Sequence, residues 1–226
     1  IAINARYAGW ADKPVFLNRM SGRTSVSLDE SVLAPFAEAL QDPAPRKLIV
    51  LHLIGAHPHY ALRYPASFAP DWGSDRVTEQ LKNFGRYPWV IIARDQYDAA
   101  MRYQDEVLSQ LLTLTRENAL LSGIPTDWLF LSDHGQETGD YINRAGHSPR
   151  TPAGFRIPLL FWSSDDAPRI PARRPFRADG LSPLLLSVAG IHWSRENPAE
   201  NFASQDYRWR RPAISAEDTE LPPSEN

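Results

Sequence analysis

Histidines and acidic residues gather in two short stretches of this sequence, each at the end of an apolar run. The first stretch, "HLIGAHPHY" (52–60), holds three histidines, and the second, "SDHGQET" (132–138), holds Asp133 and His134. Imidazole nitrogens and carboxylate oxygens, in a chain without cysteine, form a ligand set that suits zinc or another borderline divalent ion. The two stretches therefore indicate a metal site or a catalytic pair, with an ordinary polar turn as the alternative.

Each candidate also has a structural interpretation that the sequence leaves open. His52 lies inside an apolar run and could be a core histidine, whereas His59 could be an exposed loop residue. His147, in the loop "RAGHSP", suits a loop role as well as a site. Glu137 could orient a metal ligand or be a surface acid. His192 follows a predicted helix end in "GIHWS", where capping or packing is the favoured role.

The hydrophobic pattern predicts the strands that must position these candidates. "KLIVLHLIG" (47–55) is a continuous apolar run, which favours a strand buried on both faces of a parallel sheet. "WLFLS" (128–132) predicts a second strand, which ends at Asp133. "FRIPLLFWSS" (155–164) predicts a third, in which Pro158 favours an edge or a bulge. Functional groups collect at the carboxyl ends of parallel strands, so the first two strands would bring both polar stretches together.

Two helices are predicted before and between these strands. Residues 27–42 carry Ser27 and Glu30 at the spacing of a capping box, and Pro35 indicates that the regular part of the helix begins late. Residues 97–118 show the strongest helical pattern in the chain. The apolar face of this helix is expected to be core and consists of Tyr97, Met101, Val107, Leu108, Leu111 and Leu112.

A last helix is predicted at residues 179–191, ended by Gly190. Strands that alternate with helices indicate an α/β fold with a mostly parallel sheet. We expect residues 1–210 to belong to a single domain and residues 211–226 to form a polar tail.

Composition excludes several classes of protein. The hydrophobic content of 42% excludes global disorder, and 226 residues are enough for one sizeable core. A net charge of -3, from 24 basic and 27 acidic residues, argues against nucleic acid as a partner. No apolar run is long enough to span a membrane, and the opening "IAINARYAGW" is not a signal peptide. That opening leads us to expect that the chain is part of a longer protein.

The quoted motifs, taken in order, resemble the phosphoethanolamine transferases of Gram-negative bacteria, within the alkaline-phosphatase/sulfatase superfamily. The family's S-D-H-G signature, followed by G-H or L-H, is similar to "LSDHGQETGD...AGHSP". Its H-x-x-G-[ST]-H and Y-x-x-R-Y-P motifs are similar to "LHLIGAHPHYALRYP", and its Y-D-N-[ST] helix is similar to "YDAAMRYQDEVLSQLL". The short spacing after His57 is most similar to the subgroup that modifies lipopolysaccharide core sugars, with the lipid A-modifying enzymes more distant.

The resemblance implies a three-layer α/β/α sandwich with a mostly parallel sheet, of which this chain lacks the N-terminal part. It also implies a location at the periplasmic face of the bacterial inner membrane, anchored by upstream transmembrane helices. The implied reaction is zinc-dependent transfer of phosphoethanolamine from phosphatidylethanolamine to lipid A or a core sugar of lipopolysaccharide, through a phosphothreonine intermediate. One or two zinc ions are implied as cofactors.

The family's site residues match five positions of this sequence. Asp133 and His134 match two zinc ligands. His57 and His147 match histidines near the transferred phosphate, with catalytic and substrate-binding roles, which hold a second metal in some members. His52 matches a further histidine of the substrate-binding cluster.

The sequence departs from the family's pattern at its start. The family's nucleophilic threonine and a glutamate zinc ligand lie upstream of the first quoted motif, and Thr24 in "SGRTSVS" is the only threonine among residues 1–46. We therefore expect the nucleophile upstream of residue 1 and no activity from this chain alone. The alternatives are a sulfatase or phosphoglycerol transferase of the same superfamily, and a non-catalytic metal-binding relative. The sulfatase motif C/S-x-P-x-R does not occur in the sequence.

Overall fold

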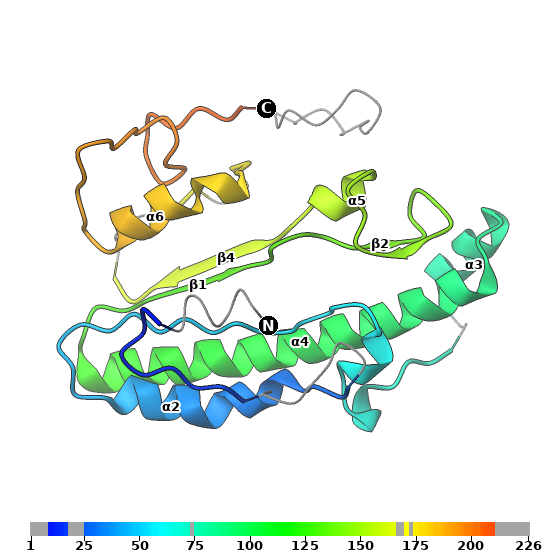
Figure 1. Cartoon of the computed structure of the whole chain (residues 1–226), viewed down its shortest axis with the longest axis horizontal. Helices are drawn as coiled ribbons and strands as arrows, with labels where there is room; N and C mark the ends of the chain where they lie inside the picture. Colours follow the sequence, from blue (N-terminus) through cyan, green and yellow to red (C-terminus); the bar gives the residue numbers. More distant parts are fainter. Residues whose placement is uncertain (1–8, 18–24, 73–74, 166–169, 172–173, 211–226) are drawn as a thin grey trace.

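A computed structural model describes residues 9–17, 25–72, 75–165, 170–171 and 174–210. The helical elements are η1 (Asp29–Val32), α2 (Leu33–Gln41), η2 (Tyr60–Leu62), η3 (Ala66–Phe68), α3 (Arg76–Asn83), α4 (Pro88–Ser122), α5 (Pro152–Phe155), η4 (Ala178–Gly180) and α6 (Leu181–Val188). The strands are β1 (Asp127–Leu131), β2 (Glu137–Thr138), β3 (Ala145–Gly146) and β4 (Leu159–Ser163). Figure 1 shows α4 along the long axis of the molecule, with α2 beside it.

The long helix α4 extends beyond both predicted ends. It begins at Pro88, whose fixed φ and missing N–H suit the first turn of a helix, and it ends where Gly123 adopts a left-handed φ of 66°. Its core face is buried as predicted at Val107, Leu108 and Leu111. Met101 is 37% exposed, although Ala99, Ala100 and Tyr103 beside it are buried, so the buried face of α4 at this level lies to one side of Met101.

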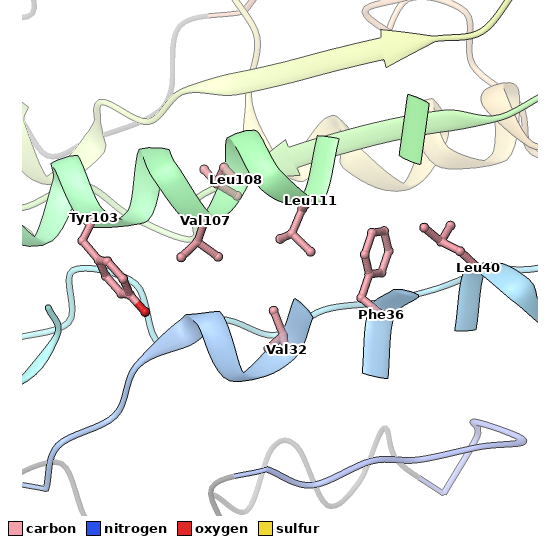
Figure 2. Close-up of a cluster of buried hydrophobic side chains, with 7 residues drawn as sticks. All are labelled: Val32, Phe36, Leu40, Tyr103, Val107, Leu108 and Leu111. Carbon is pink, nitrogen blue, oxygen red and sulfur yellow. The ribbon is translucent and has the colours of Figure 1, made fainter. Parts of the chain in front are cut away.

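The hydrophobic core lies between α2 and α4. Figure 2 shows its buried side chains, which are Val32, Phe36, Leu40, Tyr103, Val107, Leu108 and Leu111. Partly buried Ile49 and Leu53, together with Trp128 and Phe130 of β1, pack against this cluster. One core therefore joins both helices to the two segments that lead into the polar stretches.

The helix predicted at 27–42 is observed as η1 followed by α2, which confirms the late start of its regular part. The predicted capping box is wrong, since no side chain caps η1. The Glu30 amide, which Ser27 would have bonded in the box, instead donates to the Tyr103 hydroxyl at 3.1 Å. A contact with α4 thus replaces the local cap.

Residues 47–55 do not form the predicted strand. Ile49 and Leu53 pack against the core, but Leu48 and Val50 are 86% and 77% exposed, so the prediction of burial on both faces is wrong. Exposed and packed side chains alternate along this segment, as they do in a strand with one buried face. A strand also needs a hydrogen-bonded neighbour, and no described residue pairs with this segment, which Figure 1 shows running alongside α4.

The strands form two antiparallel pairs. β1 pairs with β4, with Leu129 opposite Phe161, and β2 pairs with β3, with Glu137 opposite Gly146. The described residues therefore show no parallel pairing, and two sheets of two strands each are too few to confirm the predicted sandwich. Pro158 directly precedes β4, where its missing N–H costs no ladder bond.

The last predicted helix is observed as α6, and Gly190 follows its end with a φ of 65°. Figure 1 shows α6 on the other side of β1 and β4 from α4. Within the described ranges, no helix has the length and apolar character needed to cross a membrane.

The short helix α3 is capped by Asp75. Its carboxylate accepts the Thr78 amide at 2.7 Å and a bond from the Arg94 guanidinium at 2.6 Å. These two bonds favour the charged form and lower the pKa of Asp75 to about 2.

Replacing Asp75 with asparagine is expected to lower the free energy of unfolding by about 0.5–1 kcal/mol near neutral pH. The loss is small because asparagine still caps the helix and the half-exposed carboxylate is screened by solvent. The folded pKa lies below the unfolded value, so the charge stabilises the fold above about pH 4 and this benefit is lost as the pH falls towards 2. Urea denaturation at about pH 6 and about pH 3 should show the difference between the two proteins shrinking at the lower pH. A difference that grew on acidification would contradict this prediction.

Candidate functional site

The loop after β1 is held against α5 by Gly135. Its amide donates to the Gly154 carbonyl at 2.9 Å. A Cβ at position 135 would lie 2.0 Å from the carbonyl oxygen of Ala153, closer than a side-chain carbon can approach. Only glycine allows this contact, which fixes the backbone that carries Asp133 and His134.

Asp133 and His134 lie side by side in this loop. The Nδ1–H of His134 donates to the Gly135 carbonyl at 2.9 Å, which leaves the lone pair on Nε2. One Asp133 oxygen accepts the His134 amide at 2.9 Å, while Oδ2 lies 3.8 Å from Nε2. Two ligands of one tetrahedral zinc ion are about 3.4 Å apart, so a small movement would let this pair occupy two positions of a zinc site.

His147 joins this pair from the end of β3. Its ring stacks on that of His134, with centroids 4.0 Å apart and planes at 25°. Burial and the neighbouring His134 lower the pKa of His147, which favours its neutral form near pH 7. The described residues contain no group of three histidine or acidic side chains arranged to hold a metal.

The first polar stretch reaches the same region through His57. Its Nδ1–H donates to the Pro58 carbonyl at 3.2 Å. A Cβ at Gly146 would lie 3.8 Å from Pro58 Cγ, so this loop packs beside β3. Buried Asp29 anchors the start of the loop by accepting the Gly55 amide at 2.7 Å, and burial raises the pKa of this carboxyl.

The other histidines lie on the surface. His52 is exposed, so the core-histidine alternative is wrong, and its charge interacts with Asp29. His59 is exposed with a left-handed φ of 69°. His192 is exposed, and its Nδ1 lies 3.2 Å from the Glu196 carboxylate. Thr24 lies outside the described residues.

Glu137 is fully buried, so the surface-acid alternative is wrong. Its Oε1 accepts the amides of Gly139 and Tyr141, both at 3.0 Å, whereas its Oε2 has no hydrogen-bond partner in the part of the chain that the structure describes. The carboxylate therefore shapes the turn after β2 and does not orient His134.

Sequence reasoning missed the residues that tie the two polar loops together. The Tyr60 hydroxyl donates to Gln136 Oε1 at 3.3 Å, and the Tyr60 ring packs edge-on against Tyr97 of α4, with centroids 5.3 Å apart. Tyr60 is only 3% exposed. All three residues stand within the quoted motifs, but their contact depends on the folding of distant segments.

Comparisons with known proteins identify the family of this chain. A sulfatase family model matches residues 2–191, so the chain belongs to the sulfatase family. The predicted relation to phosphoethanolamine transferases is confirmed by two relatives. The chain is 32% identical over 215 residues to the phosphoethanolamine transferase EptC of Escherichia coli (strain K12), covering 87% of this chain and 35% of that protein. It is 32% identical over 214 residues to the phosphoethanolamine transferase CptA of Salmonella typhimurium, with the same coverage of each.

Two solved structures extend the likeness to the fold. The C-terminal periplasmic domain of E. coli EptC, in complex with Zn, superposes with a TM-score of 0.79 at 25% identity, covering 91% of this chain and 58% of that one. The corresponding domain of EptC from Campylobacter jejuni gives a TM-score of 0.65 at 27% identity, covering 82% and 60%. The fold is therefore of the sulfatase type. The chain spans about 35% of the length of the curated relatives named above.

Proposed function

We propose that the intact protein, meaning this chain with whatever its gene encodes on either side, is a zinc-dependent phosphoethanolamine transferase. It moves phosphoethanolamine from phosphatidylethanolamine to lipid A or a core sugar of lipopolysaccharide. The group passes through a phosphothreonine intermediate, whose threonine lies upstream of residue 1. Residues 1–210 are the C-terminal portion of its catalytic domain and residues 211–226 are a tail. The domain works at the periplasmic face of the inner membrane, anchored by upstream helices.

One observation carries this proposal. Asp133, His134 and His147 lie together, at the end of β1 and of β3, in a chain that is about a third identical to phosphoethanolamine transferases. Asp133 and His134 would hold zinc, which neutralises phosphate charge and lowers the pKa of a nucleophilic hydroxyl. The remaining ligands come from outside the described residues.

The histidines around the pair have roles suited to phosphoryl transfer. His147, with its lowered pKa, accepts the proton of the acceptor hydroxyl as that oxygen attacks phosphorus and the bond from phosphorus to the threonine oxygen breaks. His57, as an imidazolium whose Nδ1–H stays bonded to the Pro58 carbonyl, donates its Nε2–H to an oxygen of the transferred phosphate. His52 lies at the edge of the same substrate-binding cluster. Alternatively, His57 and His147 hold a second zinc ion. Such positioning and charge stabilisation are most of what phosphoryl transfer requires.

Expression of the intact protein in an E. coli strain that lacks its own phosphoethanolamine transferases tests the proposal. Mass spectrometry of the lipopolysaccharide should show an added phosphoethanolamine group, and mild acid cleavage should separate lipid A from core to locate it. Hydrolysis of sulfate esters, or transfer of phosphoglycerol with no phosphoethanolamine transfer, would contradict it in favour of a related activity. Zinc binding without any turnover would favour a non-catalytic relative.

A further inference from the structure

A cavity of about 460 Å³ lies between α3, α4, α5 and the turn after β2, and this volume is typical of small-molecule pockets. Gln136 and Ala153 line it, so the cavity lies beside the loop that carries His134. The charged and aromatic side chains around it are Arg94, Tyr97, Asp98, Asp140, Tyr141 and Arg156. None of these side chains belongs to the candidate zinc site.

On its α4 side the cavity is lined by Arg94 and Asp98, and two further carboxylates, those of Asp75 and Asp95, lie next to Arg94. Arg94 pairs with Asp98 at 2.5 Å and with Asp75 at 2.6 Å, and it also lies 3.5 Å from Asp95. Burial raises the pKa of Asp98, and nearby carboxylates, Asp140 among them, raise it further against the opposing effect of Arg94. Three carboxylates around the one Arg94 guanidinium, with Asp140 near Asp98, leave an excess of negative charge, which attracts a cation.

The rings of Tyr97 and Tyr141 lie beside Asp98 and Asp140 on one side of the cavity. Tyr97 lies near Asp98 and Asp140, whose charges add to burial in raising the pKa of its hydroxyl, and Tyr141 lines the cavity next to Asp140. Aromatic faces beside carboxylates are surroundings in which proteins hold ammonium groups. The buried Glu137 fixes the turn that presents Asp140 and Tyr141, so their position is built into the fold.

Arg156 supplies positive charge on the α5 side of the cavity. Within the described ranges, its guanidinium makes no ion pair or hydrogen bond. Its carbonyl oxygen would lie 2.6 Å from a Cβ at Gly135, which places the residue against the loop of Asp133 and His134. A guanidinium without a carboxylate partner is a good phosphate-binding group.

We propose that this cavity binds the head group of the donor lipid as a zwitterion, with the ammonium between Asp98 and Asp140 and the phosphate beside Arg156. The inference rests on the proposed function and deepens it, because it assigns the residues that select ethanolamine over uncharged head groups. A glycerol head group would leave the Asp140 carboxylate, which makes no ion pair among the described residues, without a counter-charge, whereas an ammonium pairs with it.

Equilibrium binding to the intact protein, stripped of metal by a chelator, tests this assignment apart from catalysis. The wild type should bind O-phosphoethanolamine about tenfold tighter than sn-glycerol 3-phosphate, the effect of one hydrogen bond to a charged group. Asp98→Asn and Asp140→Asn should each remove this preference. Arg156→Gln should weaken the binding of both ligands by the same factor. Glu106→Gln changes an exposed acid on α4 outside the cavity and should bind like the wild type.

A transfer assay separates failure of this inference from failure of the proposed function. The inference predicts that Asp98→Asn and Asp140→Asn raise KM for phosphatidylethanolamine about tenfold with little change in kcat. A wild type that transfers the group, with both variants keeping its KM and its ligand preference, would overturn the inference. A wild type with the Asp98-dependent preference but no transfer would overturn the proposed function alone. Loss of the Asp98–Arg94 ion pair could unfold the Asp98→Asn variant. Asp140 makes no ion pair among the described residues, so Asp140→Asn remains informative in that case.

Discussion

Replacing Asp133 and His134 together with alanine is expected to remove zinc from the intact protein and to slow phosphoethanolamine transfer about 1,000-fold or more. The size of the effect follows from the position of the pair. Nε2 of His134 and Oδ2 of Asp133 are 3.8 Å apart, and the bond from Nδ1 to the Gly135 carbonyl holds the imidazole in the tautomer that can bind a metal. Loss of both side chains would remove two of the ligands that we propose for one ion.

Metal analysis of the purified protein, together with the transfer assay, checks this prediction. His192→Ala is the matched control, because His192 is exposed and lies outside the site. That variant should keep its zinc and its rate. A double variant that retained stoichiometric zinc would show that the ligands lie elsewhere, even if activity were lost.

Replacing Gly135 with alanine is expected to destabilise the chain by about 3 kcal/mol and to disrupt zinc binding, because the added carbon cannot be accommodated. It would lie 2.0 Å from the Ala153 carbonyl oxygen and 2.6 Å from that of Arg156, and both are backbone atoms. The loop must therefore move away from α5 and lose the bond from the Gly135 amide to the Gly154 carbonyl.

Urea denaturation of the chain measures the loss, with Gly180→Ala as the control. The nearest atom to a Cβ at Gly180 is the Glu200 carbonyl oxygen at 3.1 Å, so this variant should change stability by only about 1 kcal/mol. Gly154→Ala, whose Cβ would lie 1.8 Å from the Ser148 carbonyl oxygen, should resemble Gly135→Ala. Equal stabilities of all three variants and the wild type would show that the contact between the loop and α5 is not tight in solution.

Much of the fold and of the candidate site could be predicted from local sequence pattern. The apolar run that stops at Asp133 predicted β1 and placed Asp133 and His134 just past its end, because a strand and its end are set by neighbouring residues. The face of Val107, Leu108 and Leu111 on α4 was predicted for the same reason, since helical periodicity is local. The motif resemblance identified the family, which the comparisons confirm.

Other features depend on which distant segments meet. The segment 47–55 has the composition of a strand, but pairing requires a neighbour that no described residue supplies. The stacking of His147 on His134, and the bond from Tyr60 to Gln136 across 76 positions, carry no local signal. The Glu30 amide donates to the Tyr103 hydroxyl and not to the Ser27 side chain, because an acceptor on a distant segment competes with a local one.

The sequence by itself determined the types of residues at the site and the elements that carry them, because strand and helix patterns and turn glycines act over a few residues. Only the tertiary structure decided which side chains share a space. The cavity beside His134 is the clearest case, since its acids come from α4 and the turn after β2, and Arg156 follows α5. Such a grouping arises from long-range packing, which no spacing along the chain encodes.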